Sequence, residues 1–254
     1  MTLSQADYII ETRGLTKEFN GFTAVRDVSL KIRRGTIHAL IGPNGAGKST
    51  MFNLVTRFLP ATAGSILFNG QEITHTAPEQ VARRGLVRSF QISAVFAGLT
   101  VRDNVRIALQ RPTGLTYRFW KPETSLHHLH DRVSALLAEV DLLEYADRPA
   151  GELSYGRKRA LELATTLALD PEMLLLDEPM AGLGVEDIAR TSALIKRAAA
   201  SRTVLMVEHN LSVVESLSDV ITVLTRGEVL LEGRYAEVAN HPAVIEAYLG
   251  VAHA

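Results

Sequence analysis

The feature that most constrains the fold is a glycine-rich loop that follows a short apolar run. The run IHALI covers residues 37–41, and the loop GPNGAGKST follows at once over residues 42–50. The loop fits the pattern G-x-x-x-x-G-K-[ST], with Gly42 and Gly47 in register. Its glycines let consecutive backbone N–H groups point inward, and a helix that begins at the end of the loop adds its positive end. The order of strand, loop and helix therefore predicts a polyphosphate site.

Two side chains at the end of this loop indicate how the polyphosphate is held. Lys48 should reach the terminal phosphates as a point charge, and the Ser49 hydroxyl should hold Mg²⁺, which bridges phosphate oxygens. We expect the polyphosphate to lie against the whole loop, that is Gly42, Pro43, Asn44, Gly45, Ala46, Gly47, Lys48, Ser49 and Thr50. An ordinary glycine-rich turn is the alternative.

A second segment supplies acids. In MLLLDEP, residues 173–179, four apolar residues in a row predict a strand that is buried on both faces and ends at Asp177 and Glu178. Such a strand end is where an open α/β sheet binds ligands. We expect Asp177 to act on Mg²⁺ through a water and Glu178 to polarise the attacking water as general base. Adjacent acids are otherwise a common solvated strand end, but beside a phosphate loop the catalytic interpretation is favoured.

These segments, with LSYGR at residues 153–157, resemble the ATPase subunit of ABC transporters over essentially the whole chain. LSYGR resembles the LSGGQ signature of that family, which opens a helix and binds the γ-phosphate held by a partner subunit. Ser154 stands at the predicted N-cap of that helix, where a hydroxyl and free N–H groups form an anion site. Ser154 and Gly156 match the residues of the family signature, whereas Tyr155 and Arg157 differ from it. The resemblance implies that two ATP molecules are bound between two subunits.

Four further residues take a role from the resemblance alone. Gln91 matches a glutamine that contacts Mg²⁺ and the lytic water at the junction with a helical subdomain, and His209 in VEHN matches the switch histidine at the γ-phosphate. Phe19 matches the aromatic residue that stacks on adenine. Gly184 ends the loop AGLG that crosses between subunits, at a position where Asn or Asp is common. By themselves these residues also fit a surface glutamine, a structural histidine and a core phenylalanine. Together with Lys48 and Glu178, we place Gln91 and His209 in the catalytic set.

The resemblance implies an α/β fold, namely a P-loop NTPase (RecA-like) core with an antiparallel β subdomain and an inserted α-helical subdomain. We expect one domain over residues 1–254. Residues 1–91 and 160–254 would form the nucleotide-binding core with the β subdomain, and residues 92–159 the helical subdomain. In that insertion one apolar helix stripe is evident, made of Val133, Leu136, Leu137 and Val140.

Local patterns predict several elements of the core. Residues 7–19 and 24–32 look like strands, the second with Val28, Leu30 and Ile32 in alternation. Residues 74–85 predict a short helix, with Thr76 and Glu79 at capping-box spacing. Residues 219–233 predict a hairpin that two short helices follow.

Composition excludes several classes. A net charge of −1 gives no reason to expect nucleic acid as a partner, and the absence of cysteine excludes disulfides and thiol chemistry. No apolar run approaches the roughly 20 residues of a membrane helix, and no signal sequence is evident. We expect a peripheral protein at the cytoplasmic face of the bacterial inner membrane. His127, His130 and Asp131 lie within reach of one predicted helix face and could ligate a metal, but a solvated helix start is the favoured interpretation.

Within the family, the chain resembles the longer ATPase subunit of bacterial branched-chain amino acid importers. The residues behind this are 85–105, LSYG, VEHN and 241–250. The implied partners are a second ATPase subunit, identical or homologous in a head-to-tail dimer, two transmembrane permease subunits and, indirectly, a solute-binding protein. The solute and the identity of the second subunit stay open. A soluble regulatory or assembly ATPase with no permease is the main alternative. A kinase or GTPase does not explain LSYGR, and a chromosome-organising ATPase would need a long heptad segment.

Overall fold

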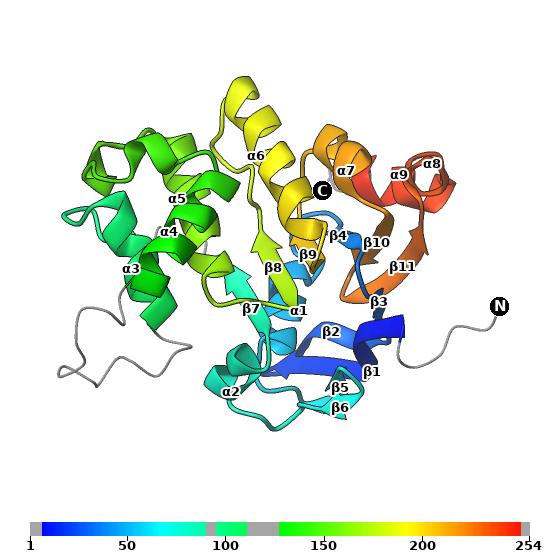
Figure 1. Ribbon diagram of the computed structural model, residues 1–254. Helices are drawn as coiled ribbons and strands as arrows, with labels where there is room; N and C mark the ends of the chain where they lie inside the picture. Colours follow the sequence, from blue (N-terminus) through cyan, green and yellow to red (C-terminus); the bar gives the residue numbers. More distant parts are fainter. Residues whose placement is uncertain (1–6, 90–94, 111–126, 250–254) are drawn as a thin grey trace.

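The computed structural model describes residues 7–89, 95–110 and 127–249. Two sheets and a set of helices make up the molecule, with one sheet at the base of the view in Figure 1 and the helical lobe at the left. Gln91 and residues 111–126, which belong to the predicted helical subdomain, lie outside the described residues.

The smaller lobe is an antiparallel sheet of five strands. Its order is β2-β1-β5-β6, and β3 also pairs with β1. The strands are β1 (Tyr8–Phe19), β2 (Phe22–Val28), β3 (Lys31–Arg33), β5 (Ala63–Phe68) and β6 (Gln71–Glu72). Within β2, Asp27 has φ of +48°, and the pairing with β1 is irregular there. The single strand predicted over residues 24–32 is wrong, because β2 ends at Val28 and a separate strand, β3, begins at Lys31. As a result, β2 pairs with the C-terminal half of β1 and β3 with its N-terminal half.

The larger sheet has six strands in the order β11-β10-β4-β9-β8-β7. Five of them run parallel, and β11 adds to one edge as the antiparallel partner of β10. The strands are β4 (Ile37–Ile41), β7 (Leu86–Ser89), β8 (Met173–Asp177), β9 (Thr203–Val207), β10 (Val220–Thr225) and β11 (Glu228–Gly233). The predicted hairpin at residues 219–233 and the buried strand before Glu178 are confirmed.

Both faces of the large sheet are covered, which explains why its central strands read as unbroken apolar runs. In β8, Met173 and Leu175 pack with α1 (Lys48–Val55) and the small sheet, while Leu174 and Leu176 pack on the opposite side. That opposite side carries α5 (Tyr155–Leu167), α6 (Val185–Ala199), α7 (Leu211–Leu217), α8 (Tyr235–Ala239) and α9 (Pro242–Leu249). The α/β core with an antiparallel subdomain is therefore confirmed.

The helical lobe consists of α3 (Val101–Gln110), α4 (His127–Glu139), two 3₁₀ turns (Leu143–Tyr145 and Ala150–Glu152) and the start of α5. The predicted apolar stripe is confirmed, since Val133, Leu136, Leu137 and Val140 are all fully buried. The helix α5 runs without interruption through residue 159, so the predicted end of the helical subdomain falls inside one helix.

The predicted capping box of the short helix α2 (Pro78–Arg83) is wrong. Ala77 is the N-cap, with extended backbone angles, and no side chain caps the helix. Proline disfavours helical angles in the residue before it and is itself well suited to the first helical position. With Thr76 as N-cap the helix would begin at Ala77. Because of Pro78, Ala77 is the N-cap instead and α2 begins one residue later, at Pro78. Within the described residues, no helix is both long and apolar enough to cross a bilayer.

Candidate functional site

The phosphate loop has a backbone that only glycine permits at two places. Gly42 and Gly47 have φ of +152° and +99°. A Cβ on Gly42 would lie 2.2 Å from the carbonyl oxygen of Leu224, and one on Gly47 would lie 2.5 Å from that of Ala24. The loop is therefore pressed between the ends of β10 and β2, and its two motif glycines are required by close backbone contact.

Lys48 opens α1 and turns back into this loop. Its side chain is buried, and Nζ donates to the carbonyl oxygens of Gly42 at 2.8 Å and Pro43 at 2.9 Å. Burial lowers the pKa of Lys48, and the negative charge of Glu178 opposes that shift. A cation is thus held at the centre of the loop by two neutral acceptors, which an anion could replace.

A cavity of about 380 Å³ lies in front of the loop and brings together most of the residues singled out from the sequence. Asn44 to Thr50 form one wall, and Glu178 and His209 approach from the ends of β8 and β9. Phe19 and Phe22, at the turn between β1 and β2, complete the lining and are 42% and 65% exposed. Exposed aromatic rings beside a cationic loop suit a ligand with a flat ring and a charged tail.

The two acids at the end of β8 have different surroundings. Glu178 has φ of +47°, and such a conformation is costly for a residue other than glycine. Its Oε1 lies 2.8 Å from Nε2 of His209. Its backbone N–H donates to the carbonyl oxygen of Val207 at 3.0 Å, so the end of β9 fixes the backbone of Glu178 after β8. Asp177 instead is buried as the last residue of the strand.

Arg88 is the site residue that sequence reasoning missed most clearly. It lies on β7, forms an ion pair with Asp177 and donates to Oδ1 of Asn53 at 2.6 Å. The Arg88 and Asp177 side chains are only 14% and 6% exposed. Their strands are adjacent in the sheet but 89 residues apart along the chain, so no local pattern links them.

Glu208 was also missed as a positioning group. It is 4% exposed, and its Oε1 accepts a hydrogen bond from the backbone of Met180 at 2.9 Å, while Oε2 accepts one from the backbone of His209 at 3.0 Å. One buried carboxylate thus fixes the segments that follow β8 and β9. The available signal was an acid that directly follows a fully buried strand.

The signature segment begins α5 as predicted. Ser154 is the N-cap, and its side-chain oxygen accepts from the backbone N–H of Arg157 at 3.5 Å. A Cβ on Gly156 would lie 2.3 Å from the carboxyl carbon of Asp187, so a larger residue there would require the Asp187 side chain to move. Arg157 stacks over the ring of Tyr145, 4.3 Å from its centroid. Among the residues that line the described cavity, neither Ser154 nor Gly156 appears.

Two other expectations can be placed, and one further residue contacts the phosphate loop. Gly184 is the N-cap of α6 with no side-chain cap, and Glu186 and Asp187 provide the acids of the first turn. His127 begins α4 and His130 is exposed, but the described residues contain no group of three ligands suited to a metal ion. Burial raises the pKa of Tyr248, near the end of α9, and its interaction with the backbone of Gly42 opposes that shift.

Known proteins match the chain over nearly all of its length. A family profile described as ABC transporter matches residues 25–181, and one described as Branched-chain amino acid ATP-binding cassette transporter matches residues 228–254. The chain is 38% identical over 251 residues to the high-affinity branched-chain amino acid transport ATP-binding protein BraF of Pseudomonas aeruginosa, covering 96% of this chain and 98% of the relative. Identity to the corresponding protein LivG of Escherichia coli is also 38%, with the same coverage.

A solved structure supports the same assignment. The crystal structure of the ADP conformation of an ATP-binding cassette of an ABC transporter has a TM-score of 0.84 and 32% identity, covering 96% of this chain and 99% of that chain. A nucleotide-free cassette gives a TM-score of 0.82 at 31% identity, covering 95% and 98%. These matches confirm the resemblance drawn from the motifs. The chain therefore belongs to the ABC transporter family, as one of its ATP-binding and ATP-hydrolysing cassettes.

Proposed function

We propose that this cassette hydrolyses ATP to power the import of branched-chain or related amino acids. The printed names of BraF and LivG support the solute class, as does the C-terminal match at residues 228–254. The observation that carries the function is the convergence of Lys48, Glu178 and His209 on one cavity. A soluble regulatory ATPase gains no support from these relatives, which are named as transport proteins.

In this proposal the loop holds the triphosphate and Phe19 stacks on the adenine. Lys48 exchanges its two carbonyl partners for phosphate oxygens, because a charge-assisted hydrogen bond to an anion is the stronger one. Glu178 accepts the proton of the attacking water, and His209, 2.8 Å from it, orients that carboxylate and contacts the γ-phosphate. Gln91 is assigned to the same water from the motif alone.

The residues at the end of β8 and the start of α1 fit Mg²⁺. Ser49 lines the cavity, and Asp177 supplies a carboxylate at the adjoining strand end, so the donors are hard oxygens of the kind that Mg²⁺ prefers. Gln91 would complete the set. When bound, the ion neutralises charge on the phosphate oxygens. Arg88 holds the Asp177 carboxylate in place through their ion pair.

A second ATPase subunit would complete the site. The nucleotide cavity is open to solvent on one side, and Ser154 with the N-terminus of α5 lies apart from it in the single chain. A helix N-terminus whose cap residue carries a hydroxyl can bind anions. Two subunits in head-to-tail contact would therefore place Ser154 and Gly156 of each against the γ-phosphate held by the other.

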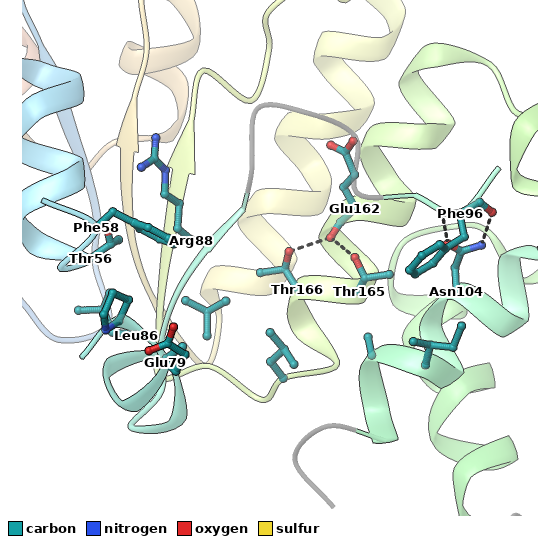
Figure 2. Close-up of a pocket in the computed structure, with 16 residues that line it drawn as sticks. Thr56, Phe58, Glu79, Leu86, Arg88, Phe96, Asn104, Glu162, Thr165 and Thr166 are labelled. Carbon is teal, nitrogen blue, oxygen red and sulfur yellow. Dashed lines mark hydrogen bonds between the residues drawn. The ribbon is translucent and has the colours of Figure 1, made fainter. Parts of the chain in front are cut away.

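The membrane subunits would bind a groove between α2, β7, α3 and α5. Its cavity has a volume of about 400 Å³ and is drawn in Figure 2. Phe58, Phe96 and Ile107 line it and are 55%, 55% and 40% exposed, which indicates a protein partner. Arg88 lines the same groove and pairs with Asp177, so the groove reaches the nucleotide site. The chain would be peripheral, at the cytoplasmic face of the inner membrane, and a solute-binding protein would act only through the permease.

Two substitutions with matched controls test the function. Glu178→Gln should retain ATP binding and abolish phosphate release, because it removes the base and spares the phosphate loop. Lys48→Ala should weaken ATP binding itself, measured by direct titration. Glu215→Gln and Lys196→Ala, at exposed positions of α7 and α6, should leave both properties unchanged. Parent-like turnover by Glu178→Gln, or unchanged ATP affinity of Lys48→Ala, would contradict the proposal.

A further inference from the structure

We propose that Tyr155 is a positioning residue that links the loop after Glu178 to the groove assigned to the membrane subunits. The inference rests on the proposed function of that groove. Tyr155 stands where the family signature has glycine, so the link depends on a side chain that the signature pattern lacks. Tyr155, and the residues Arg159 and Glu162 that connect it to the groove, do not line the cavity in front of the phosphate loop.

The tyrosine contacts the loop in two ways. Its hydroxyl donates to the carbonyl oxygen of Ala181 at 3.2 Å. Its ring packs against Gly182, which has φ of +75° and where a Cβ would lie 3.4 Å from the ring. The backbone N–H of Ala181 donates in turn to the carbonyl oxygen of Glu178 at 3.0 Å. A shift of Tyr155 would therefore move Ala181 and, through it, the backbone of Glu178, the proposed base.

Arg159, one turn further along α5, fixes the direction of this hydrogen bond. Its Nη2 donates to the Tyr155 hydroxyl at 3.0 Å, which uses the hydroxyl oxygen as acceptor and leaves its single hydrogen for Ala181. Its Nη1 donates to Oε2 of Glu162 at 2.9 Å. The Arg159 and Glu162 side chains are 10% and 9% exposed, so the pair is held firmly and is little screened by solvent.

Glu162 brings the chain of contacts to the groove. It lies among the residues that line the groove in Figure 2, where its carbonyl oxygen accepts from the hydroxyls of Thr165 and Thr166 at 2.8 Å each. Its Oε1 is buried and has no hydrogen-bond partner among the described residues. Because Oε1 is covered, a segment that fills the groove would act on Glu162 by displacing its side chain. Such binding would pull on Arg159 and, through it, on Tyr155.

Hydrogen exchange on the full-length chain tests this link without any permease. Tyr155→Phe keeps the ring and removes the hydroxyl, so exchange of the amides of Ala181 and Leu183 should rise about 3- to 10-fold, the factor that corresponds to one net hydrogen bond. Tyr145→Phe is the control, because its ring contact with Arg157 does not use the hydroxyl. Glu162→Gln should also raise this exchange, but not further in the Tyr155→Phe background. Unchanged exchange, or additive effects of the two substitutions, would overturn the inference.

A second readout separates a positioning role from general loss of structure. In the complex with the membrane subunits, Tyr155→Phe should lower kcat for ATP about 3- to 10-fold with KM unchanged. A rise in KM alone, or a kcat equal to that of Tyr145→Phe, would count against the inference. If no permease binds the unmodified chain, the proposed function fails, while the exchange measurement still decides the role of Tyr155.

Discussion

The ion pair between Arg88 and Asp177 offers the sharpest test of how the site is built. Replacing Arg88 by Met keeps most of the side-chain volume but removes the charge. The change would leave the Asp177 carboxylate, 6% exposed at the end of β8, without its partner, and would also remove the 2.6 Å hydrogen bond to Asn53. The cost should therefore come from an uncompensated buried charge rather than from a cavity.

The expected magnitude follows from that environment. Breaking one side of a buried ion pair typically costs about 3–5 kcal/mol, whereas removing both partners costs far less. Since Arg88 is 14% exposed, we expect the lower part of this range, about 3 kcal/mol, for Arg88→Met. The double variant Arg88→Met with Asp177→Asn should recover about 2 kcal/mol of this loss.

Urea unfolding of the parent, the two single variants and the double variant measures these values in metal-free buffer. A double-mutant cycle then gives the coupling free energy of the pair. A coupling free energy of about 2 kcal/mol or more supports a structural ion pair beside the proposed Mg²⁺ position. Additive effects, or a loss below about 1 kcal/mol for Arg88→Met, the range of a surface pair, would show that the pair does not stabilise the fold as a buried ion pair.

Three further results are expected. Gly47→Ala should lower stability by about 1–3 kcal/mol and weaken nucleotide binding, because φ is +99° and Ala24 lies in the way; a parent-like thermal midpoint and titration would contradict this. Burial lowers the pKa of His38 to about 4, with Thr222 at 2.7 Å, so the folded state disfavours the charged form. The contribution of neutral His38 to the free energy of unfolding should be fully present above about pH 6.5 and should fall by up to ~3 kcal/mol toward pH 4. Urea titrations at several pH values should show a weaker pH dependence for His38→Gln. Ser154→Ala should cost only about 0.5–1 kcal/mol of stability, because its cap bond is long, yet reduce ATP turnover much more; equal loss of both would argue for a plain helix cap.

The parts of the fold set by local chemistry could be predicted from the sequence. Ser154 caps α5 because its hydroxyl and the helix start are neighbours along the chain, and the buried stripe from Val133 to Val140 follows from helical spacing. The predicted start of α2 was wrong because two local signals competed. Proline at position 78 overrode the capping box of Thr76.

Contacts between distant segments could not be predicted in this way. Arg88 reaches Asp177 only because β7 and β8 are paired in parallel, and Glu208 reaches Met180 only because β8 and β9 are neighbours. The link from Glu162 to Ala181 also depends on how α5 packs beside the loop after β8. Pairing order of strands is a tertiary property, so these residues carry no pattern of their own in the sequence.

We propose that each ATP is enclosed by two subunits, with the phosphate loop of one and Ser154 of the other. Light scattering of the Glu178→Gln variant with Mg²⁺ and ATP, alone and mixed with the second ATPase subunit, tests this most directly. We predict an ATP-dependent rise from the mass of one chain, 27.8 kDa, to that of a pair, and its loss when Ser154→Ala is added. Saturated ATP binding while the mass stays that of one chain in both samples would contradict the claim.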